Sequence, residues 1–515
     1  MILVVAAGHL SLFPKVADLD GFYHVGHAAA YLEGSFFDTS LPWATKSIIR
    51  DQGADLWWGF HVLLAPFATF DDPATGIRMA AILLTTIMGL VVYRVLRRHD
   101  VPRAGLWAVV SLIAVPNVFF RYLMVRPHVL SLAASLALLS VLVRGRWWHV
   151  LLLSASISWL HLSLFWVAPG IVMAYALTRV LLVSAGGWDA NDRAVPIAHA
   201  FGAVVAGTLL GWALRPHPMA TASLLNVQLI RLFAQKATEE PLLFASELLP
   251  IGLPELIRTT WAFIAAWTAG VLVTGSAALR GRLGRLGRER VTFLVAATLV
   301  SLVFLGLALL SARRAMVQWV AFGFLTLPFV WALLEETLAT GPSRKRRVLG
   351  GAAAVALAVH VAWGAWRHSL NVDLVAFAGD SLSEVSTFLA ANSEPGDVVF
   401  HARWDNFGPL LAHNRVNHYL GGMDPIFQFA HDPRSYWEHF YMSVDVNVEW
   451  TCDSYPCPGG VATDSYLVIR DHFGARWVLV EPRRNPRLSL FLLGDPRFEL
   501  ALETQREAVF AVLPD

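Results

Sequence analysis

Long apolar runs, separated by short polar or basic stretches, fill the first 366 residues of the chain. A membrane-spanning helix needs roughly 20 mostly apolar residues. The pattern predicts spanning helices over 75–96, 104–122, 128–143, 147–160, 163–184, 195–213, 259–279, 291–311, 315–334 and 349–366. Residues 1–13 are apolar but too short to cross a bilayer, so we expect them to be the end of a first helix that is cut short.

Basic residues cluster in several connections between these runs, and the positive-inside rule turns such clusters into an orientation. The clusters lie at 94–103, 144–146, 280–290 and 344–347. All four fall on the cytoplasmic side if the aromatic-rich segment 56–70 lies in the membrane interface instead of crossing it. We then expect about eleven transmembrane helices. The segments 14–74 and 213–258, and everything after 366, are expected on the extracytoplasmic side.

The pattern changes to that of a soluble domain after residue 366, so we divide the chain into a transmembrane domain, 1–366, and a second domain, 367–515. Helices are expected at 379–391 and 466–473, strands at 397–401 and 476–481, and a hairpin at 498–513. The predicted fold class is an α-helical polytopic membrane protein with a C-terminal extracytoplasmic α/β domain. Its predicted location is the inner or plasma membrane.

Composition agrees with the membrane assignment and narrows the partners. Of the 515 residues, 56% are hydrophobic and only 15% are charged, whereas a soluble domain averages about 25% charged residues. The net charge is +2, and no basic patch of the kind that binds nucleic acid is evident. We therefore expect membrane lipid as a partner and no nucleic acid.

The only two cysteines, Cys452 and Cys457, both lie in the second domain. They are expected to form a disulfide if that side of the membrane is oxidising, and to be free thiols otherwise. A zinc site at these cysteines is not expected, because a second ligand pair of suitable spacing is missing.

The first outer segment places two carboxylates and two histidines beside an apolar run, at Asp18, Asp20, His24 and His27. Such groups are costly at a membrane edge unless they face water or a partner. Asp20, His24 and His27 would share one helix face. They could bind a metal ion, with Asp20 and His24 as ligands, or supply a general base. The alternative is that Asp18 caps the helix and the histidines lie in the interface.

Arginines on the outer side, which disfavours positive charge, indicate an anionic partner. Arg121, Arg126 and His128 lie at one outer helix junction, and Arg313 and Arg314 at another. Guanidinium groups hold phosphate through paired donors, so we predict phosphate binding at both junctions. The alternative is that these arginines extend to the interface to reach water.

Two further candidates lie in the remaining outer segments. Glu247 is the carboxylate of 213–258 that we select for catalysis, with a solvated loop charge as the alternative. In the second domain, Trp404 and Asp405 belong to a segment, 403–408, that we expect to bend toward a ligand. Both candidates rest on position alone.

Together these features resemble the GT-C glycosyltransferase superfamily, which includes protein O-mannosyltransferases, aminoarabinose lipid A transferases and oligosaccharyltransferases. The resemblance rests on Asp18-Leu19-Asp20-Gly21-Phe22-Tyr23-His24 after the first helix and on Arg126-Pro127-His128-Val129-Leu130-Ser131. It rests equally on the outer arginines and the C-terminal α/β domain. It covers most of the chain in architecture, through short motifs.

The resemblance implies a transferase that moves a sugar from a polyprenyl-phosphate donor to an extracytoplasmic glycan, lipid or protein. By it, Asp20 or Asp18 would be the catalytic base. Arg126, with Arg313 or Arg314, would hold the lipid phosphate and offset charge on the leaving group. A divalent ion such as Mg²⁺ or Mn²⁺ would be allowed, and no cofactor is assigned with certainty.

The segment 404–408 is similar in position to the Trp-Trp-Asp-Tyr-Gly acceptor motif of oligosaccharyltransferases, but it departs from that motif. Arg403 replaces the first Trp, and an Asn-Phe pair replaces the Tyr. The second outer loop also lacks the paired carboxylates that bind metal in that family. Both departures argue against protein N-glycosylation by that route.

Two other hypotheses stay open. A transporter or flippase of a lipid-linked glycan would carry ionisable residues near the membrane midplane and repeated halves, and the sequence shows neither. A GT-C-fold scaffold that has lost catalysis and serves envelope assembly would have the same sequence pattern as the enzyme.

Overall fold

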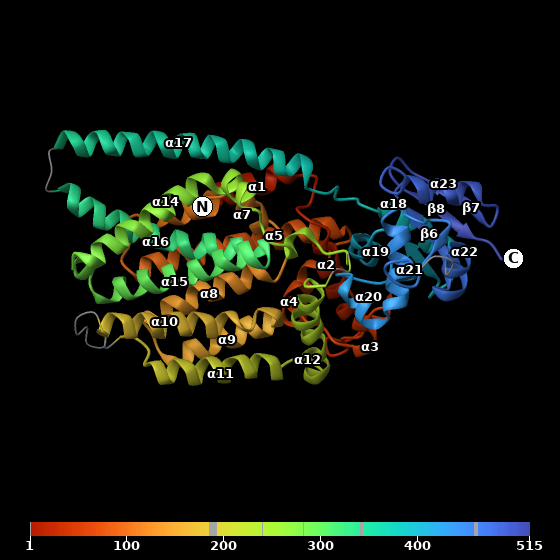
Figure 1. The fold of residues 1–515 in the computed structure, drawn as a ribbon, viewed down its shortest axis with the longest axis horizontal. Coiled ribbons are helices and arrows are strands. Elements are labelled where there is room, and N and C mark those ends of the chain that lie inside the picture. Colours follow the sequence, from red (N-terminus) through yellow and green to blue (C-terminus); the bar gives the residue numbers. More distant parts are fainter. Residues whose placement is uncertain are drawn as a thin grey trace. The chain divides into compact units, whose positions relative to one another are not determined.

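The computed structural model of the protein describes residues 2–184, 193–238, 240, 242–281, 283–339, 343–457 and 462–514. It is mostly helical and divides into two compact units (Figure 1). The first unit comprises Met1–Asp18, Arg78–Leu214 and Ser246–Ala376. The second comprises Leu19–Ile77, Arg215–Ala245 and Phe377–Asp515.

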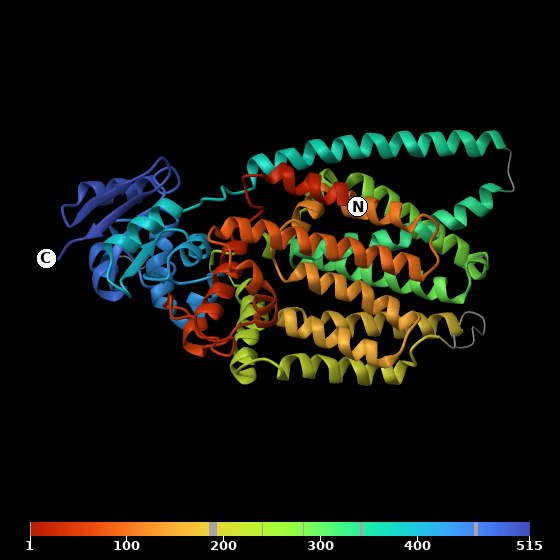
Figure 2. The same ribbon diagram turned by 180° about the vertical axis from the view of Figure 1, so that it is seen from behind.

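The first unit is a bundle of apolar helices. They are α1 (Ile2–Leu12), α5 (Pro73–Arg98), α6 (Ala104–Ile113), α7 (Pro116–Tyr122), α8 (His128–Val143), α9 (Trp147–Leu160), α10 (Val167–Ser184), α11 (Ile197–Ala213), α14 (Leu253–Leu279), α15 (Arg288–Leu310), α16 (Met316–Ala339) and α17 (Ser343–Leu374). In both views α17 lies along one side of this bundle and α11 along the opposite side (Figures 1 and 2). Every predicted span therefore contains a helix.

Close packing of α9 and α11 depends on two glycines. A Cβ atom at Gly207 would collide with the carbonyl oxygen of Leu151, and one at Gly211 with that of Ala155. Glycines four residues apart on one helix face let two backbones approach, as is common between helices in membranes.

The number of membrane spans is smaller than expected when helix length is the criterion. Among the described residues, five helices are long and apolar enough to cross a membrane, or seven if each of two broken helix pairs is one span. α8 has 16 residues and α9 has 14, fewer than the roughly 20 that a span needs. The expected count of about eleven spans is therefore not confirmed.

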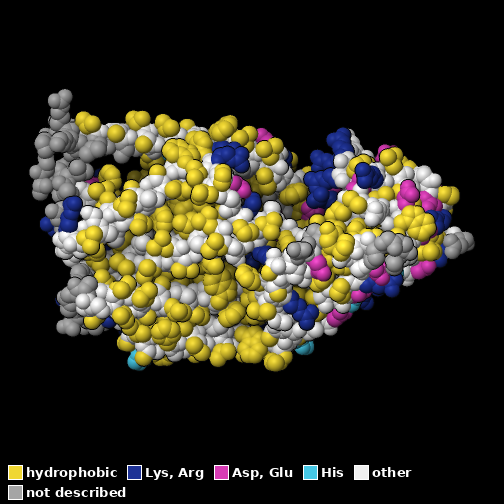
Figure 3. Space-filling model, in the orientation of Figure 1, with side chains coloured by type: hydrophobic (Ala, Val, Ile, Leu, Met, Phe, Trp, Pro, Cys, Tyr) yellow, Lys and Arg dark blue, Asp and Glu magenta, His cyan; other side chains and the backbone are white. Residues whose placement is uncertain are grey.

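One of the broken pairs is α6 and α7, which are bent by 97°. Pro116 begins α7 and has no N–H to continue the helical ladder, which explains the break. Hydrophobic side chains cover much of the visible face over α10, α11, α14 and α15 (Figure 3). These surfaces indicate a multi-pass membrane protein.

The second unit is built on a six-stranded sheet of order β1-β3-β2-β6-β8-β7. The strands are β1 (Ala44–Thr45), β2 (Val398–His401), β3 (His418–Leu420), β6 (Ala475–Val480), β7 (Phe498–Glu503) and β8 (Ala508–Val512). The first four run parallel, and β8 pairs antiparallel with both β6 and β7. The strands and the hairpin predicted for this region are present. A separate pair joins β4 (Trp450–Thr451) to β5 (Thr463–Asp464).

Eleven further helices belong to the described part of this unit. They are α2 (Asp20–Glu33), α3 (Ile48–Gln52), α4 (Trp58–Leu64), α12 (Pro218–Asn226), α13 (Leu232–Gln235), α18 (Ser383–Asn392), α19 (Phe407–His413), α20 (Ile426–His431), α21 (Pro433–Ser443), α22 (Ser465–Leu467) and α23 (Pro486–Gly494). The predicted helices at 379–391 and 466–473 correspond to α18 and to α22 with the π-helical turn Val468–His472 that follows it.

The second unit joins segments that the predicted division at residue 366 keeps apart. β1, from the first outer segment, pairs with β3 of the C-terminal region, and α2 packs on α19. A Cβ atom at Gly26 of α2 would lie 3.0 Å from the Cα of Ala412, which shows how closely the two helices approach. Composition cannot reveal that distant segments pair in one sheet, because it describes residues that are neighbours in the chain.

Cys452 and Cys457 form a disulfide in this unit, as one of the two hypotheses predicted. The same unit has a buried core that includes Phe400, Met442, Tyr466, Val478 and Phe510.

Candidate functional site

A cluster of charged side chains surrounds Glu247 in the first unit. Glu247 lies in a short 3₁₀ turn, Ser246–Leu248, whereas Arg121 lies in the last turn of α7 and Arg126 precedes α8. Nη2 of Arg121 donates to Oε2 of Glu247 at 2.7 Å, and Nη1 of Arg126 donates to Oε1 at 2.8 Å. Each oxygen of this carboxylate therefore receives its own guanidinium group, in the geometry that favours strong charge-assisted hydrogen bonds.

Arg126 also holds the second carboxylate of the cluster. Its Nε donates to Oδ2 of Asp18, a residue that is only 5% exposed. The other oxygen, Oδ1, has no hydrogen-bond partner among the described residues. The hypothesis that Asp18 caps the helix after it is wrong, because Leu19 occupies that position and no side chain caps it. The carboxylate is instead engaged by Arg126.

Two more predicted residues belong to this cluster. Arg314 interacts electrostatically with Glu247. His128 interacts electrostatically with Arg121, Arg126 and Glu247. The Nε2 atom of His128 is buried and has no hydrogen-bond partner within the described ranges. Three guanidinium groups face two carboxylates, so the cluster keeps one net positive charge if the imidazole is neutral.

The arginines determine the charge state of Glu247. Burial alone would raise its pKa, but the charges of Arg126, Arg121 and Arg314, with the hydrogen bond from Arg121, hold that pKa well below its ordinary value. A carboxylate that stays ionised in this way accepts a proton poorly. The geometry therefore suits Glu247 to positioning the arginines better than to acting as a base.

Replacing Glu247 with glutamine is expected to lower the stability of the protein by about 2 kcal/mol at neutral pH, the cost of losing charged hydrogen bonds. Because the folded-state pKa of Glu247 is depressed, its contribution is fully present above its ordinary value of 4.5 and is lost as the pH falls through the folded-state pKa. The midpoint temperature of thermal unfolding, measured on detergent-purified protein, should therefore decrease less between pH 7 and pH 3 for Glu247→Gln than for wild type.

Glu255→Gln provides the control, because Glu255 pairs with Arg313 at a more exposed position, 3.1 Å from Nη1. Exposed pairs contribute less than about 1 kcal/mol. Identical pH profiles for wild type and Glu247→Gln would contradict the account of the cluster. The same pair shows that Arg313 has a carboxylate partner outside the cluster.

The histidines of the segment 14–74 form a buried network in the second unit. Asp20 begins α2 and is half-buried, whereas His24 and His27 of the same helix are buried. Nδ1 of His24 lies 2.8 Å from Nε2 of His61, and Nδ1 of His61 lies 2.6 Å from Oδ2 of Asp55. The chain of contacts therefore runs from α2 through α4 to a buried carboxylate.

Asp55 is the fixed end of this network. Its Oδ1 accepts from the backbone N–H of Trp57 at 2.7 Å, and its Oδ2 accepts from the hydroxyl of Tyr31 at 2.8 Å. Burial would raise its pKa, but His61 and His27 keep that pKa well below its ordinary value. Arg215 donates to the backbone carbonyl of Asp55 at 2.9 Å and brings a cation near the carboxylate.

The sequence does not predict Asp55 or His61 as site residues, because His61 lies in the segment 56–70 that is predicted to lie in the membrane interface and Asp55 directly precedes it. The available signal was an aspartate and a histidine that bracket the aromatic start of a short helix, which is unusual for a segment in contact with lipid.

No protein-family model matches this sequence, and no curated protein matches it. Solved structures do match. The oligosaccharyltransferase of Archaeoglobus fulgidus in the apo form superposes with a TM-score of 0.55 at 11% identity, over 93% of this chain and 69% of that chain. ArnT from Cupriavidus metallidurans superposes with TM-scores of 0.52 in the apo state and 0.51 bound to undecaprenyl phosphate. Both ArnT comparisons show 12% identity and cover 99% of this chain and 97% of that chain.

The chain has the GT-C fold. At such low identity the likeness concerns the fold alone, and the GT-C fold that the sequence motifs predicted is thereby confirmed.

Within this GT-C fold, the structure gathers most of the predicted site residues of the first unit. The cluster contains Asp18, Arg121, Arg126, His128, Glu247 and Arg314. Asp20 and His24 belong to the second unit.

Trp404 and Asp405 lie in a 3₁₀ turn, Trp404–Asn406, in the second unit of the GT-C fold. Asp405 accepts from Arg403, at 3.0 Å from Nε and 2.5 Å from Nη2. The next residues, Phe407 and Gly408, pack on α2, and a Cβ atom at Gly408 would lie 2.8 Å from the carbonyl oxygen of Leu19. These packing contacts explain much of the conformation of the segment 403–408. Ligand binding by Trp404 and Asp405 stays a prediction.

One group in the described part of this GT-C fold could hold a metal ion. Ligand atoms of His27, Asp55 and His61 all lie within 4.8 Å of one another. Burial and the neighbouring His61 lower the pKa of His27 to about 3, so this imidazole is neutral at physiological pH. Two imidazoles with one carboxylate suit zinc better than Mg²⁺ or Mn²⁺, which prefer oxygen ligands. The group does not include Asp20 or His24, the pair expected from the sequence.

Proposed function

We propose that this protein is a membrane glycosyltransferase that uses a polyprenyl-phosphate-linked sugar as donor and an extracytoplasmic acceptor. The observation that carries the proposal is the convergence of Arg121, Arg126 and Arg314 on Glu247 at the ends of apolar helices. The GT-C fold supports it, as does the description of one ArnT structure as bound to undecaprenyl phosphate.

The arginine cluster is suited to the leaving group of such a reaction. When the bond between the anomeric carbon and the phosphate oxygen breaks, the electron pair stays on that oxygen and negative charge develops there. Fixed guanidinium groups in a site of low polarity stabilise developing charge strongly. Asp18 and Glu247 accept hydrogen bonds from Arg126 and keep its guanidinium in place.

We assign the role of general base to Asp20. It would accept the proton of the acceptor hydroxyl while the acceptor oxygen attacks the anomeric carbon. Asp20 is half-buried at the first turn of α2. Asp18 is the second candidate, but its Oδ2 atom already accepts a hydrogen bond from Nε of Arg126. No step is assigned to a metal ion.

The experiment that tests this function is the release of polyprenyl phosphate from a labelled polyprenyl-phosphate sugar by the purified protein. Release that depends on Asp20 and on Arg126 would support it. Binding of the lipid without release by wild-type protein would favour the scaffold or flippase hypothesis.

We further propose that the second unit lies on the extracytoplasmic side of the inner or plasma membrane. The disulfide between Cys452 and Cys457 supports this side, because disulfides persist in oxidising compartments. In intact cells, a membrane-impermeant thiol reagent is expected to label these cysteines only after an impermeant reductant has been added. Labelling that requires cell lysis would contradict the proposed orientation.

A further inference from the structure

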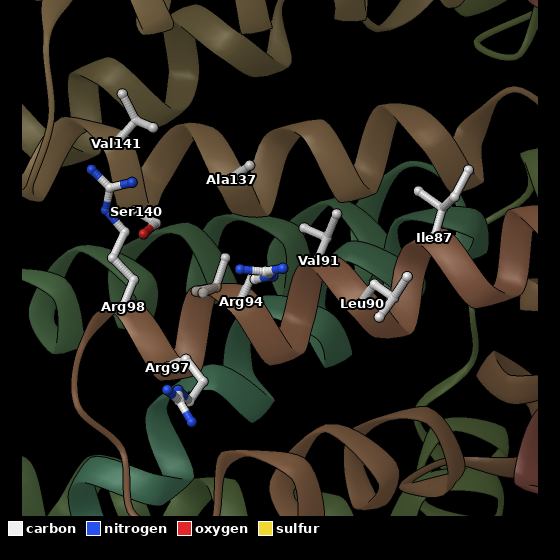
Figure 4. A pocket seen from close by; sticks show the side chains of 10 residues that line it. Ile87, Leu90, Val91, Arg94, Arg97, Arg98, Ala137, Ser140 and Val141 are labelled. Atoms are coloured by element: carbon white, nitrogen blue, oxygen red, sulfur yellow. The ribbon is translucent and has the colours of Figure 1, made fainter. Parts of the chain in front are cut away.

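A groove of about 530 Å³ lies on the first unit between α5 and α8 (Figure 4). Its walls are apolar along most of their length and include Ile87, Leu90 and Val91 of α5 and Ala137 and Val141 of α8. α5 is one of the five described helices that could cross a membrane. The groove therefore runs along a helix that is long and apolar enough to cross a membrane.

One end of the groove is strongly basic. Arg94, Arg97 and Arg98 line it at the last turns of α5, and all three are exposed. Arg98 donates to the backbone carbonyl of Arg144, and Arg144 donates to that of Arg98 at 2.7 Å. Figure 4 shows Arg97 and Arg98 toward the end that holds Ser140 and Val141, Arg94 about midway near Ala137, and Leu90 and Ile87 farther along the groove.

This basic end is far from the candidate donor site. The cluster around Glu247 lies beside His128, the first residue of α8, whereas Val141 belongs to the last turn of that helix. At 1.5 Å per residue, the two ends of α8 are separated by about 20 Å. A ligand at the arginines of α5 is therefore a different molecule from the proposed sugar donor.

We propose that the groove between α5 and α8 is a binding site for an anionic phospholipid, with its phosphate at Arg94, Arg97 and Arg98 and an acyl chain along the apolar walls. Charge complementarity commits the site to an anionic headgroup, because a zwitterionic lipid would place its own cation among three guanidinium groups. Basic pockets between membrane helices recognise anionic headgroups in this way. Under the predicted orientation, the lipid belongs to the cytoplasmic leaflet.

The test measures how much phosphatidylglycerol and phosphatidylcholine the purified full-length protein retains in native mass spectrometry. The variant R94Q/R97Q/R98Q is expected to retain phosphatidylglycerol at least fivefold less than wild type, since each arginine near an anionic headgroup contributes about a fivefold gain in affinity. Retention of phosphatidylcholine is expected not to change.

The matched control is R280Q/R285Q/R288Q, which removes three exposed arginines, two from the connection between α14 and α15 and one from the first position of α15. None of these three arginines is part of the groove. The control is expected to retain phosphatidylglycerol like wild type. Equal losses in both triple variants would overturn the proposal, because they would show only a general attraction of the basic surface.

A second variant keeps the test decisive if the triple variant folds poorly. Leu90→Trp fills the apolar part of the groove, where Leu90 is 44% exposed, and leaves every charge in place. It is expected to reduce phosphatidylglycerol retention by a similar factor. Wild-type retention by a well-folded Leu90→Trp protein would show that no acyl chain lies there and would contradict the proposal.

Discussion

Replacing Arg126 with alanine is expected to lower the affinity for undecaprenyl phosphate about 100-fold. Arg126 makes hydrogen bonds to both carboxylates of the cluster, Asp18 and Glu247. Its loss removes one charged contact with the phosphate and leaves the two carboxylates less neutralised. Losing such a charge-assisted contact costs about 3 kcal/mol, which corresponds to about two powers of ten in affinity. The measurement is equilibrium binding of the lipid to detergent-purified protein.

Two variants make this result interpretable. Arg288→Ala removes an exposed arginine at the start of α15 and should leave the affinity unchanged. Arg126→Lys keeps the charge but loses the forked donor geometry, so it should lie between wild type and Arg126→Ala. If Arg126→Ala and Arg288→Ala bind the lipid equally well, the cluster is not a phosphate site.

Replacing Asp20 with asparagine is expected to reduce the rate of sugar transfer by about 1000-fold while leaving lipid binding intact. General-base catalysis typically contributes 10²- to 10⁴-fold, and asparagine keeps the size of the side chain while removing the proton acceptor. The measurement compares single-turnover transfer with binding of the lipid for the same preparation.

Asp18→Asn tests the alternative base. Since Asp18 pairs with Arg126, this variant should lose donor affinity more than it loses the rate of the chemical step. If Asp20→Asn transfers sugar at the wild-type rate and Asp18→Asn transfers it about 1000-fold more slowly, Asp18 and not Asp20 is the general base.

The sequence predicted the helices of the first unit well, because a run of apolar residues specifies a helix in a membrane almost irrespective of tertiary context. It could not predict the 97° bend between α6 and α7 as such, although Pro116 was visible. The same apolar run is compatible with a straight span or with two short helices, and packing decides between them.

The candidate site was predictable residue by residue but not as an assembly. Arg121, Arg126 and Glu247 stood out as charges at apolar helix ends, yet nothing in their spacing showed that Glu247 would join both arginines. Arg313 and Arg314 are adjacent in the chain and looked equivalent. The structure separates them, because Glu255 at the start of α14 pairs with Arg313.

The contacts that join His24, His61 and Asp55 could not be predicted from the sequence for a related reason. Its members lie on different elements, and their aromatic neighbours are typical of an interfacial segment as well as of a buried one. The distinction depends on how this segment folds with the rest of the second unit. β1, only two residues long, was invisible for the same reason, since it exists through its pairing with β3.

Transfer from a panel of labelled polyprenyl-phosphate sugars by the purified protein tests the central claim most directly. The account predicts that wild-type protein releases polyprenyl phosphate from at least one donor, and that Asp20→Asn and Arg126→Ala do not release it at a comparable rate. No release from any donor by well-folded wild-type protein that binds polyprenyl phosphate would contradict it, and would identify a GT-C fold that binds the lipid without catalysing transfer.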